Sequence, residues 1–61
     1  MPKGTVLYDF TPATDEEIAL KAGETVLLLE KVDQAWYNGE NSSGAIGDFP
    51  ADYIQVVVPL P

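Results

Sequence analysis

The sequence predicts a small all-β domain, because short strand-like runs alternate with turn residues along a short chain. The runs are rich in Val, Ile, Thr and aromatic residues, which favour strands. Gly, Pro, Asn and Ser separate them at short intervals. The chain has 61 residues, which is enough for one domain. We therefore expect one domain over residues 1–61, with its folded core at about 4–58.

The expected strands are separated by segments that interrupt regular pairing. Gly23 is expected to take a positive φ in the turn before the second long strand. Ser42–Gly44 has the composition of a tight hairpin turn. Pro50 lacks an N–H, so it is expected to stop pairing and to begin a 3₁₀ turn that ends at Tyr53. Strands are expected at Thr5–Phe10, Ile18–Leu20, Thr25–Glu30, Trp36–Asn41, Ala45–Phe49 and Ile54–Val58.

One segment, Asp15–Leu29, contains enough Glu, Ala, Leu and Lys to suggest a helix. Gly23 lies in its middle, where glycine costs a helix about 1 kcal/mol relative to alanine. The β-branched pair Thr25-Val26 follows, so we prefer strands there. Alternation with polar neighbours marks the expected inward-facing positions, which are Val6, Ile18, Val26, Leu28, Ala45 and Phe49.

The chain is strongly acidic, with ten acidic residues, three lysines and a net charge of −7. This charge favours partners that carry lysine or arginine. It disfavours nucleic acid and direct binding to an anionic membrane, because both need a basic surface. No apolar run is long enough to span a bilayer, and the sequence has no secretion-signal pattern.

Cysteine and histidine are absent, which excludes metal sites built from thiolate or imidazole ligands. The absence of cysteine fits a reducing compartment, so we expect a cytoplasmic protein. Any association with a membrane would come from the rest of a longer parent protein. No dyad, triad or glycine-rich phosphate loop is recognisable, and Asp15–Glu17 lacks the spacing of a calcium loop. We expect no catalysis, no cofactor and no metal.

Four blocks of sequence, in the family's order and covering nearly the whole chain, resemble the SH3 domain family. Leu7–Phe10 resembles the ALYDY block, Ile18–Glu24 the ELSFKKGD block, Trp36-Tyr37 the tryptophan pair and Gly47–Ile54 the G-x-[FI]-P-x-N-Y-V block. Within the family, residues 32–39 and 54–61 look most like the C-terminal SH3 domain of endophilins. The resemblance implies a five-stranded barrel of two packed antiparallel sheets with one 3₁₀ turn.

The resemblance also implies a groove for proline-rich peptides. Such peptides form a polyproline II helix, which is ordered before binding and therefore loses little chain entropy. The Trp36 indole N–H and the Tyr53 hydroxyl would donate hydrogen bonds to ligand carbonyls. The residues that the resemblance places on the groove are Tyr8, Phe10, Trp36, Pro50, Asp52 and Tyr53.

Beside this groove, the resemblance implies a further pocket that would recognise a basic residue of the ligand. The resemblance aligns Glu17 with an acidic residue that pairs with a ligand arginine or lysine, and we add Glu16, Asp33 and Asp15 as candidates. The alternative is an acidic loop that only contacts solvent. Exposed ion pairs contribute about 0–1 kcal/mol each, so these acids would mainly affect orientation and association rate.

Three residues depart from the family pattern. Phe10 lacks the hydroxyl of the usual second tyrosine, and Asp48 stands where relatives often have an aromatic or aliphatic residue. Asp52 stands where the family usually has asparagine. An asparagine amide can donate to a ligand carbonyl, whereas an ionised aspartate can only accept, so this contact is in question.

We therefore expect a non-catalytic interaction module, monomeric when isolated, that binds proline-rich segments with basic flanking residues. The parent would be an endocytic or signalling adaptor. One alternative is a non-proline partner such as ubiquitin, although members that bind ubiquitin tend to have phenylalanine at the position of Tyr53. The other is a structural unit inside a larger protein, which would bury the groove aromatics.

Overall fold

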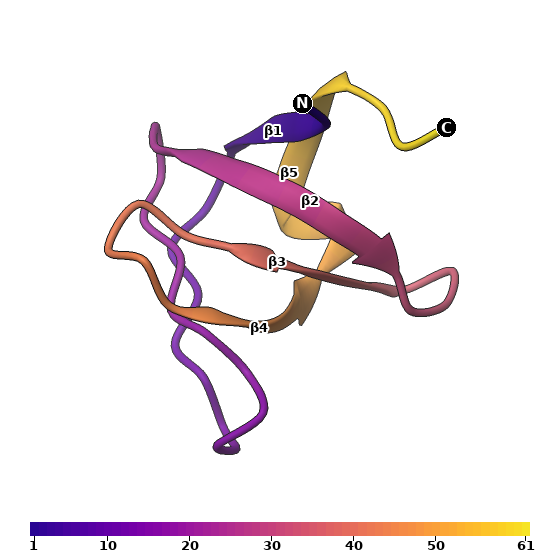
Figure 1. The fold of residues 1–61 in the computed structure, drawn as a ribbon. Coiled ribbons are helices and arrows are strands. Elements are labelled where there is room, and N and C mark those ends of the chain that lie inside the picture. The colour runs from indigo at the N-terminus through magenta and orange to yellow at the C-terminus, as the bar shows by residue number, and fades with distance from the viewer.

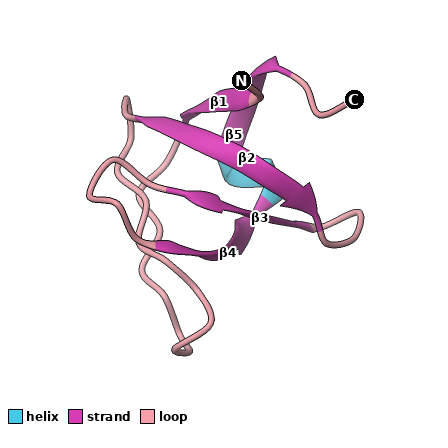
Figure 2. Cartoon of the chain, viewed as in Figure 1, coloured by secondary structure: helices cyan, strands magenta, loops and turns pink.

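The computed structural model describes residues 1–61 and contains five strands in one antiparallel sheet (Figure 1). The strand order is β4-β3-β2-β1-β5. Apart from one 3₁₀ turn, η1, there is no helix, so the expected all-β class is confirmed (Figure 2). The elements are β1 Lys3–Val6, β2 Thr25–Lys31, β3 Trp36–Glu40, β4 Ile46–Pro50, η1 Ala51–Tyr53 and β5 Ile54–Val58.

The sheet curls around a single core. Strand β1 pairs with β2 on one side and with β5 on the other, and the far end of the ladder is β4. In Figure 1, β1 and β5 lie above β3 and β4, and β2 crosses between them. The two layers that the resemblance implies are therefore two parts of one ladder. Seven buried residues form the core, namely Val6, Ile18, Leu20, Val26, Leu28, Phe49 and Ile54.

The first strand ends earlier than the sequence predicts. It stops at Val6, and Phe10 keeps only an isolated bridge to Leu20. The intervening backbone is held by other partners: the Leu7 N–H donates to the Tyr53 carbonyl at 2.7 Å, and the Asp9 carboxylate accepts from the Ala22 N–H at 2.8 Å. Tertiary hydrogen bonds therefore override the strand propensity of this segment.

The prediction that Ala45 faces the core is wrong, because Ala45 is exposed and lies outside β4. The Asn41 side chain explains this position, since its Oδ1 accepts from the N–H groups of Ser43 at 3.1 Å and Ala45 at 2.9 Å. Because of these bonds, Ala45 belongs to the hairpin turn and β4 begins only at Ile46. The inward positions of β4 are Phe49, as predicted, and Gly47.

Pro50 also differs from its expected place. It is the last residue of β4 and lies opposite Trp36 in the ladder, and η1 begins only at Ala51. A proline is tolerated there because β4 is an edge strand.

Gly23 has a φ of +88°, which confirms the positive φ expected in the turn before β2. No helix is long and apolar enough to cross a membrane.

Candidate functional site

Four aromatic side chains form a continuous row, which we call the aromatic ridge and define as Tyr8, Tyr53, Phe10 and Trp36. The Tyr8 and Tyr53 ring centroids are 5.8 Å apart, those of Tyr53 and Phe10 5.4 Å, and those of Phe10 and Trp36 6.2 Å. All three contacts are edge-to-face, with interplanar angles of 74–82°. Such pairs add about 0.5–1.5 kcal/mol beyond area burial, so the ridge is partly pre-organised.

Segments that are distant in sequence position the ridge. Tyr53 ends η1, and its carbonyl accepts the hydrogen bond from Leu7 beside Tyr8. Trp36 begins β3 opposite Pro50, and the Ala51 N–H donates to the Ala35 carbonyl at 2.8 Å. These bonds bring the sequence-predicted residues Tyr8, Phe10, Trp36, Pro50 and Tyr53 to one face.

The ridge is partly open to solvent, and most open at Tyr8. Tyr8 is 60% exposed, and Phe10, Trp36 and Tyr53 are half-buried. The neighbouring Tyr37 behaves differently, because it stacks on the buried Phe49 ring at 6.1 Å and 24°. Trp36 and Tyr37 therefore lie on opposite faces of β3, as strand alternation requires.

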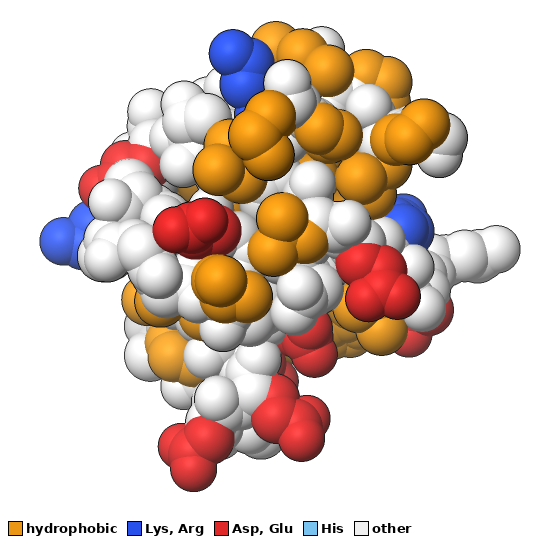
Figure 3. Space-filling model, in the orientation of Figure 1, with side chains coloured by type: hydrophobic (Ala, Val, Ile, Leu, Met, Phe, Trp, Pro, Cys, Tyr) orange, Lys and Arg blue, Asp and Glu red, His pale blue; other side chains and the backbone are white.

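One end of the ridge opens into a hollow of about 220 Å³, which we call the acidic hollow. Trp36 belongs to both surfaces. Four of the lining side chains are carboxylates, and no lysine lines the hollow. In Figure 3, apolar side chains are densest at the upper right, and acidic side chains lie at the lower end and also on the left and right flanks of this face. The lining residues are Thr14, Glu16, Glu17, Val32, Asp33, Trp36 and Asp48.

Two of the predicted acids are held in place by the backbone. Glu17 Oε1 accepts from the Ala13 N–H at 2.8 Å. Asp33 Oδ1 accepts from the N–H groups of Ala35 at 2.8 Å and Trp36 at 3.0 Å. In each case only one carboxylate oxygen has a hydrogen-bond partner within the chain, so the other can accept from a ligand.

Asp48 also lines the hollow, although the sequence indicated it only as a departure from the family pattern and not as a site residue. Its backbone joins β4 to the first loop: the Ile18 N–H donates to its carbonyl at 3.0 Å, and its own N–H donates to the Glu16 carbonyl at 2.8 Å. Its Oδ1 accepts from Asn38 Nδ2 at 3.1 Å. Its place between the buried residues Gly47 and Phe49 was the available signal, because strand alternation directs it outward. Thr14 and Val32 carried no comparable signal.

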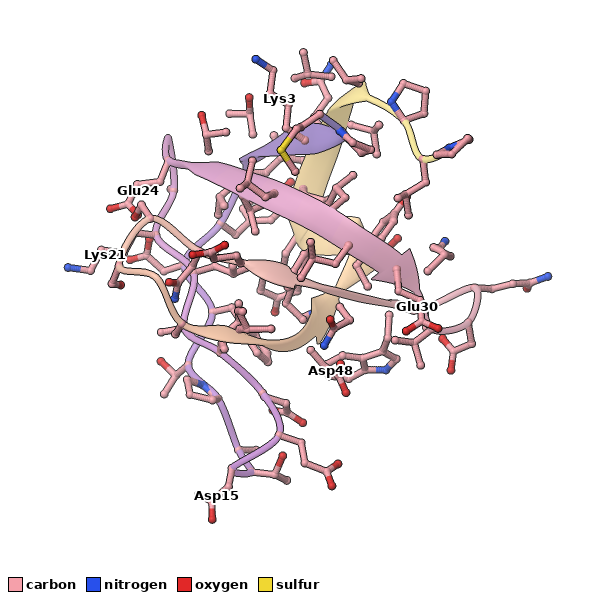
Figure 4. The ribbon with its side chains drawn as sticks, in the orientation of Figure 1. Lys3, Asp15, Lys21, Glu24, Glu30 and Asp48 are labelled. Carbon is pink, nitrogen blue, oxygen red and sulfur yellow. The ribbon has the colours of Figure 1, made fainter.

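Two predicted site residues lie apart from the hollow. Asp15 is exposed at the tip of the first loop and does not line it (Figure 4). Asp52 is exposed on η1, on the same short turn as Tyr53, and does not line it either. No group of three or more His, Cys, Asp or Glu side chains is arranged to hold a metal ion.

The family model of the SH3 domain matches residues 5–51 of the chain. The chain belongs to the SH3 domain family. SH3 domains are protein-interaction modules, and the match involves no enzyme family. The expected all-β SH3 fold is confirmed by solved structures that resemble it closely.

Among curated proteins, this SH3 domain is 43% identical to human SH3 domain-containing protein 19 over 60 residues. It is 44% identical to endophilin-A2 of Gallus gallus over 55 residues, in keeping with the predicted resemblance to endophilins. The alignments cover 98% and 90% of the chain, but only 8% and 15% of the two relatives. The SH3 domain therefore spans a small part of each relative's length.

Among solved structures, the yeast Pin3 SH3 domain is 42% identical, with a TM-score of 0.82 over 87% of this chain and 93% of that one. The C-terminal SH3 domain of Myosin IB from Entamoeba histolytica, bound to the EhFP10(GEF) peptide, is 37% identical. Its TM-score is 0.84 over 93% of each chain. A domain of this fold and similar sequence thus binds a peptide.

Proposed function

We propose that this SH3 domain binds proline-rich peptides with lysine or arginine beside the prolines, and that it catalyses no reaction. The observation that carries the proposal is the position of Trp36, which closes the aromatic ridge and also lines the acidic hollow. A peptide that extends along the ridge would reach the hollow directly. Its proline segment and its basic residue would then bind adjoining surfaces.

The ridge suits a polyproline II helix, which has three residues per turn. Its rings meet nearly at right angles, so they present both ring edges and ring faces to a ligand. One ligand proline would lie between Tyr8 and Tyr53, and the next between Tyr53 and Trp36, beside Pro50. The Trp36 indole N–H and the Tyr53 hydroxyl would donate to the free ligand carbonyls.

The hollow suits a guanidinium or ammonium group. Glu17 and Asp33 are held by backbone N–H groups and each keeps a free oxygen, while Trp36 offers an aromatic face. Such exposed pairs contribute only about 0–1 kcal/mol each, so they would mainly select ligand orientation and increase the association rate. The small interface, near or below about 1,200 Å², implies weak and transient binding.

The exposure of the ridge favours an interaction role over a purely structural one. A structural unit would cover its aromatics, whereas Tyr8 keeps 60% of its surface exposed. The similarity to endophilin-A2 and to SH3 domain-containing protein 19 supports an adaptor in endocytosis or signalling as the parent, and a cytoplasmic location.

Trp36 is the only tryptophan, so its fluorescence gives a direct test. We expect saturable changes in emission when an arginine-flanked P-x-x-P peptide is titrated into the domain. A peptide with its prolines replaced by alanine should give no saturable change. Equal responses to the two peptides would reject proline recognition. Titration of ubiquitin in the same assay tests the alternative that the domain binds a partner without a proline-rich segment.

Salt is expected to weaken binding of the arginine-flanked peptide. Raising NaCl from about 0.05 to about 0.5 M shortens the Debye length, which screens attraction between the ligand cation and the hollow. A matched peptide with glutamine in place of arginine should bind more weakly and show less dependence on salt. If the affinities of both peptides respond equally to salt, the acidic hollow does not contact the basic residue.

Asp52→Asn is expected to tighten binding of the same peptide. Asp52 is exposed on η1 beside Tyr53, and the amide of an asparagine there would add a donor for a ligand carbonyl. Asp52→Ala is the matched control, since it removes the charge without adding the donor. Calorimetric titration should rank the asparagine variant above both the alanine variant and the parent. Weaker binding by Asp52→Asn than by the parent would contradict the prediction.

A further inference from the structure

The Asn38-Gly39 step in β3 is the only place where asparagine precedes glycine in this chain. Glycine leaves the approach to its own backbone nitrogen unobstructed, because it has no Cβ. We propose that Asn38 is a site of spontaneous deamidation, that native pairing of β3 suppresses the reaction, and that opening of this strand releases it. The proposal is independent of peptide binding.

The reaction needs only the chain and water. The Gly39 backbone nitrogen forms a bond to Asn38 Cγ, and the side-chain nitrogen leaves as ammonia. The product is a five-membered succinimide. Water then breaks one of its two C–N bonds, which gives either aspartate or isoaspartate at position 38. The domain becomes more negative by one charge at neutral pH.

The native structure directs the Asn38 side chain away from this reaction. Its Nδ2 donates to Asp48 Oδ1 at 3.1 Å in a partly buried position. The side chain therefore extends across the sheet toward β4 rather than folding back onto its own peptide group. Asn38 also lies between strands on both sides, opposite Glu30 on β2 and Asp48 on β4, so its backbone is fixed.

Gly39 has no room to move as ring closure requires. It is buried, and even a Cβ at this position would overlap the Leu27 carbonyl oxygen and come within 3.0 Å of the Phe49 ring. The register of β2 shifts between Leu28 and Glu30, directly opposite this step. Ring closure must therefore wait until β3 separates from β2, which is a local or global unfolding event.

Aspartate or isoaspartate at position 38 would hinder β3 from pairing again with β2 and β4. A carboxylate at position 38 would lose the hydrogen bond from Asn38 and face Asp48 as a like charge across the strands, which is destabilising. Isoaspartate would also lengthen the backbone next to Gly39, where there is no space even for a Cβ beside the Leu27 carbonyl. Deamidation would thus mark molecules that have opened, at a position beside the acidic hollow.

The test compares folded protein with protein unfolded in urea at the same pH and temperature. Peptide mapping by mass spectrometry measures loss of each asparagine, and Asn41, which precedes Ser42, is the internal control. Asn38 should react faster than Asn41 in urea. In native buffer its rate should fall at least about tenfold, because an opening that costs about 1.4 kcal/mol already reduces the open population tenfold. Equal Asn38 rates in both states, or no Asn38 reaction in urea, would overturn the proposal.

A pair of variants tests the role of the Asp48 contact. Asp48→Ala removes the acceptor for Asn38 Nδ2 and should raise the native rate without changing the rate in urea. Ile54→Val lowers stability in the core from β5, which pairs with β1 and with neither β3 nor β4, and serves as the control for stability alone. If both variants raise the native rate only in proportion to their loss of stability, Asp48 has no specific protective role.

Discussion

Trp36→Ala is expected to weaken binding of an arginine-flanked proline-rich peptide by about thirtyfold or more, which corresponds to about 2 kcal/mol. Tryptophan is enriched among the residues that dominate binding energies. Here the side chain ends the aromatic ridge and lines the acidic hollow, so its loss would damage both proposed contacts. Calorimetric titration of parent and variant measures the change.

The domain should remain folded in this variant. Trp36 is half-buried and lies outside the seven-residue core, and its backbone N–H keeps the hydrogen bond to Asp33. Val57→Ala is the matched control, because Val57 is 56% exposed on β5 and lies outside both the ridge and the hollow. Its affinity should equal that of the parent. Unchanged affinity in a folded Trp36→Ala variant would contradict the proposed groove.

Phe49→Ala is expected to leave the domain largely unfolded at 25 °C. Phe49 is 0% exposed and contributes one of the largest fully buried side chains. Truncating a buried phenylalanine costs about 3–5 kcal/mol, and a core of this size supplies roughly 3–5 kcal/mol in total. Urea unfolding followed by circular dichroism and by Trp36 fluorescence should show little or no folded baseline.

Two further substitutions make this result interpretable. Phe49→Leu removes less volume and should stay folded with a lower urea midpoint. Ile46→Ala lies on the same strand, but Ile46 is 62% exposed, so its midpoint should change little. If Phe49→Ala unfolds at the same urea concentration as Ile46→Ala, the single-core description of the fold is wrong.

The core was largely predictable because strand alternation is a local signal. Ile18 and Leu20, like Val26 and Leu28, occupy one face at the spacing of two that a strand imposes, and all four are buried. The turn at Gly23 was equally predictable from the sequence, since few other residues tolerate its positive φ.

The errors in the fold come from contacts between segments that are distant in the sequence or from one side chain. The first strand ends at Val6 because Leu7 bonds to Tyr53, a partner that periodicity cannot reveal. Ala45 turns outward because the Asn41 side chain accepts a hydrogen bond from its N–H. Propensity describes how a residue suits a strand, and it does not include such competing acceptors.

The candidate site was predictable in its aromatic part and less so in its acidic part. The family blocks identified the aromatic residues that the structure brings together along the ridge. The path of the first loop decides which acids line the hollow, and composition contains no information on that path. Asp15 therefore lies apart at the loop tip, while Asp48 joins Glu17 through the bridge between the loop and β4.

An NMR titration can show whether one peptide spans both the aromatic ridge and the acidic hollow. The ¹⁵N-labelled domain is titrated with the arginine-flanked P-x-x-P peptide. We predict the largest shifts at the Trp36 indole N–H and at the amides of Tyr53, Glu17 and Asp48. Replacing the peptide's arginine with glutamine should reduce the shifts of Glu17 and Asp48 more than that of Tyr53. Shifts confined to β5, around Val57, would contradict binding along the ridge and the hollow.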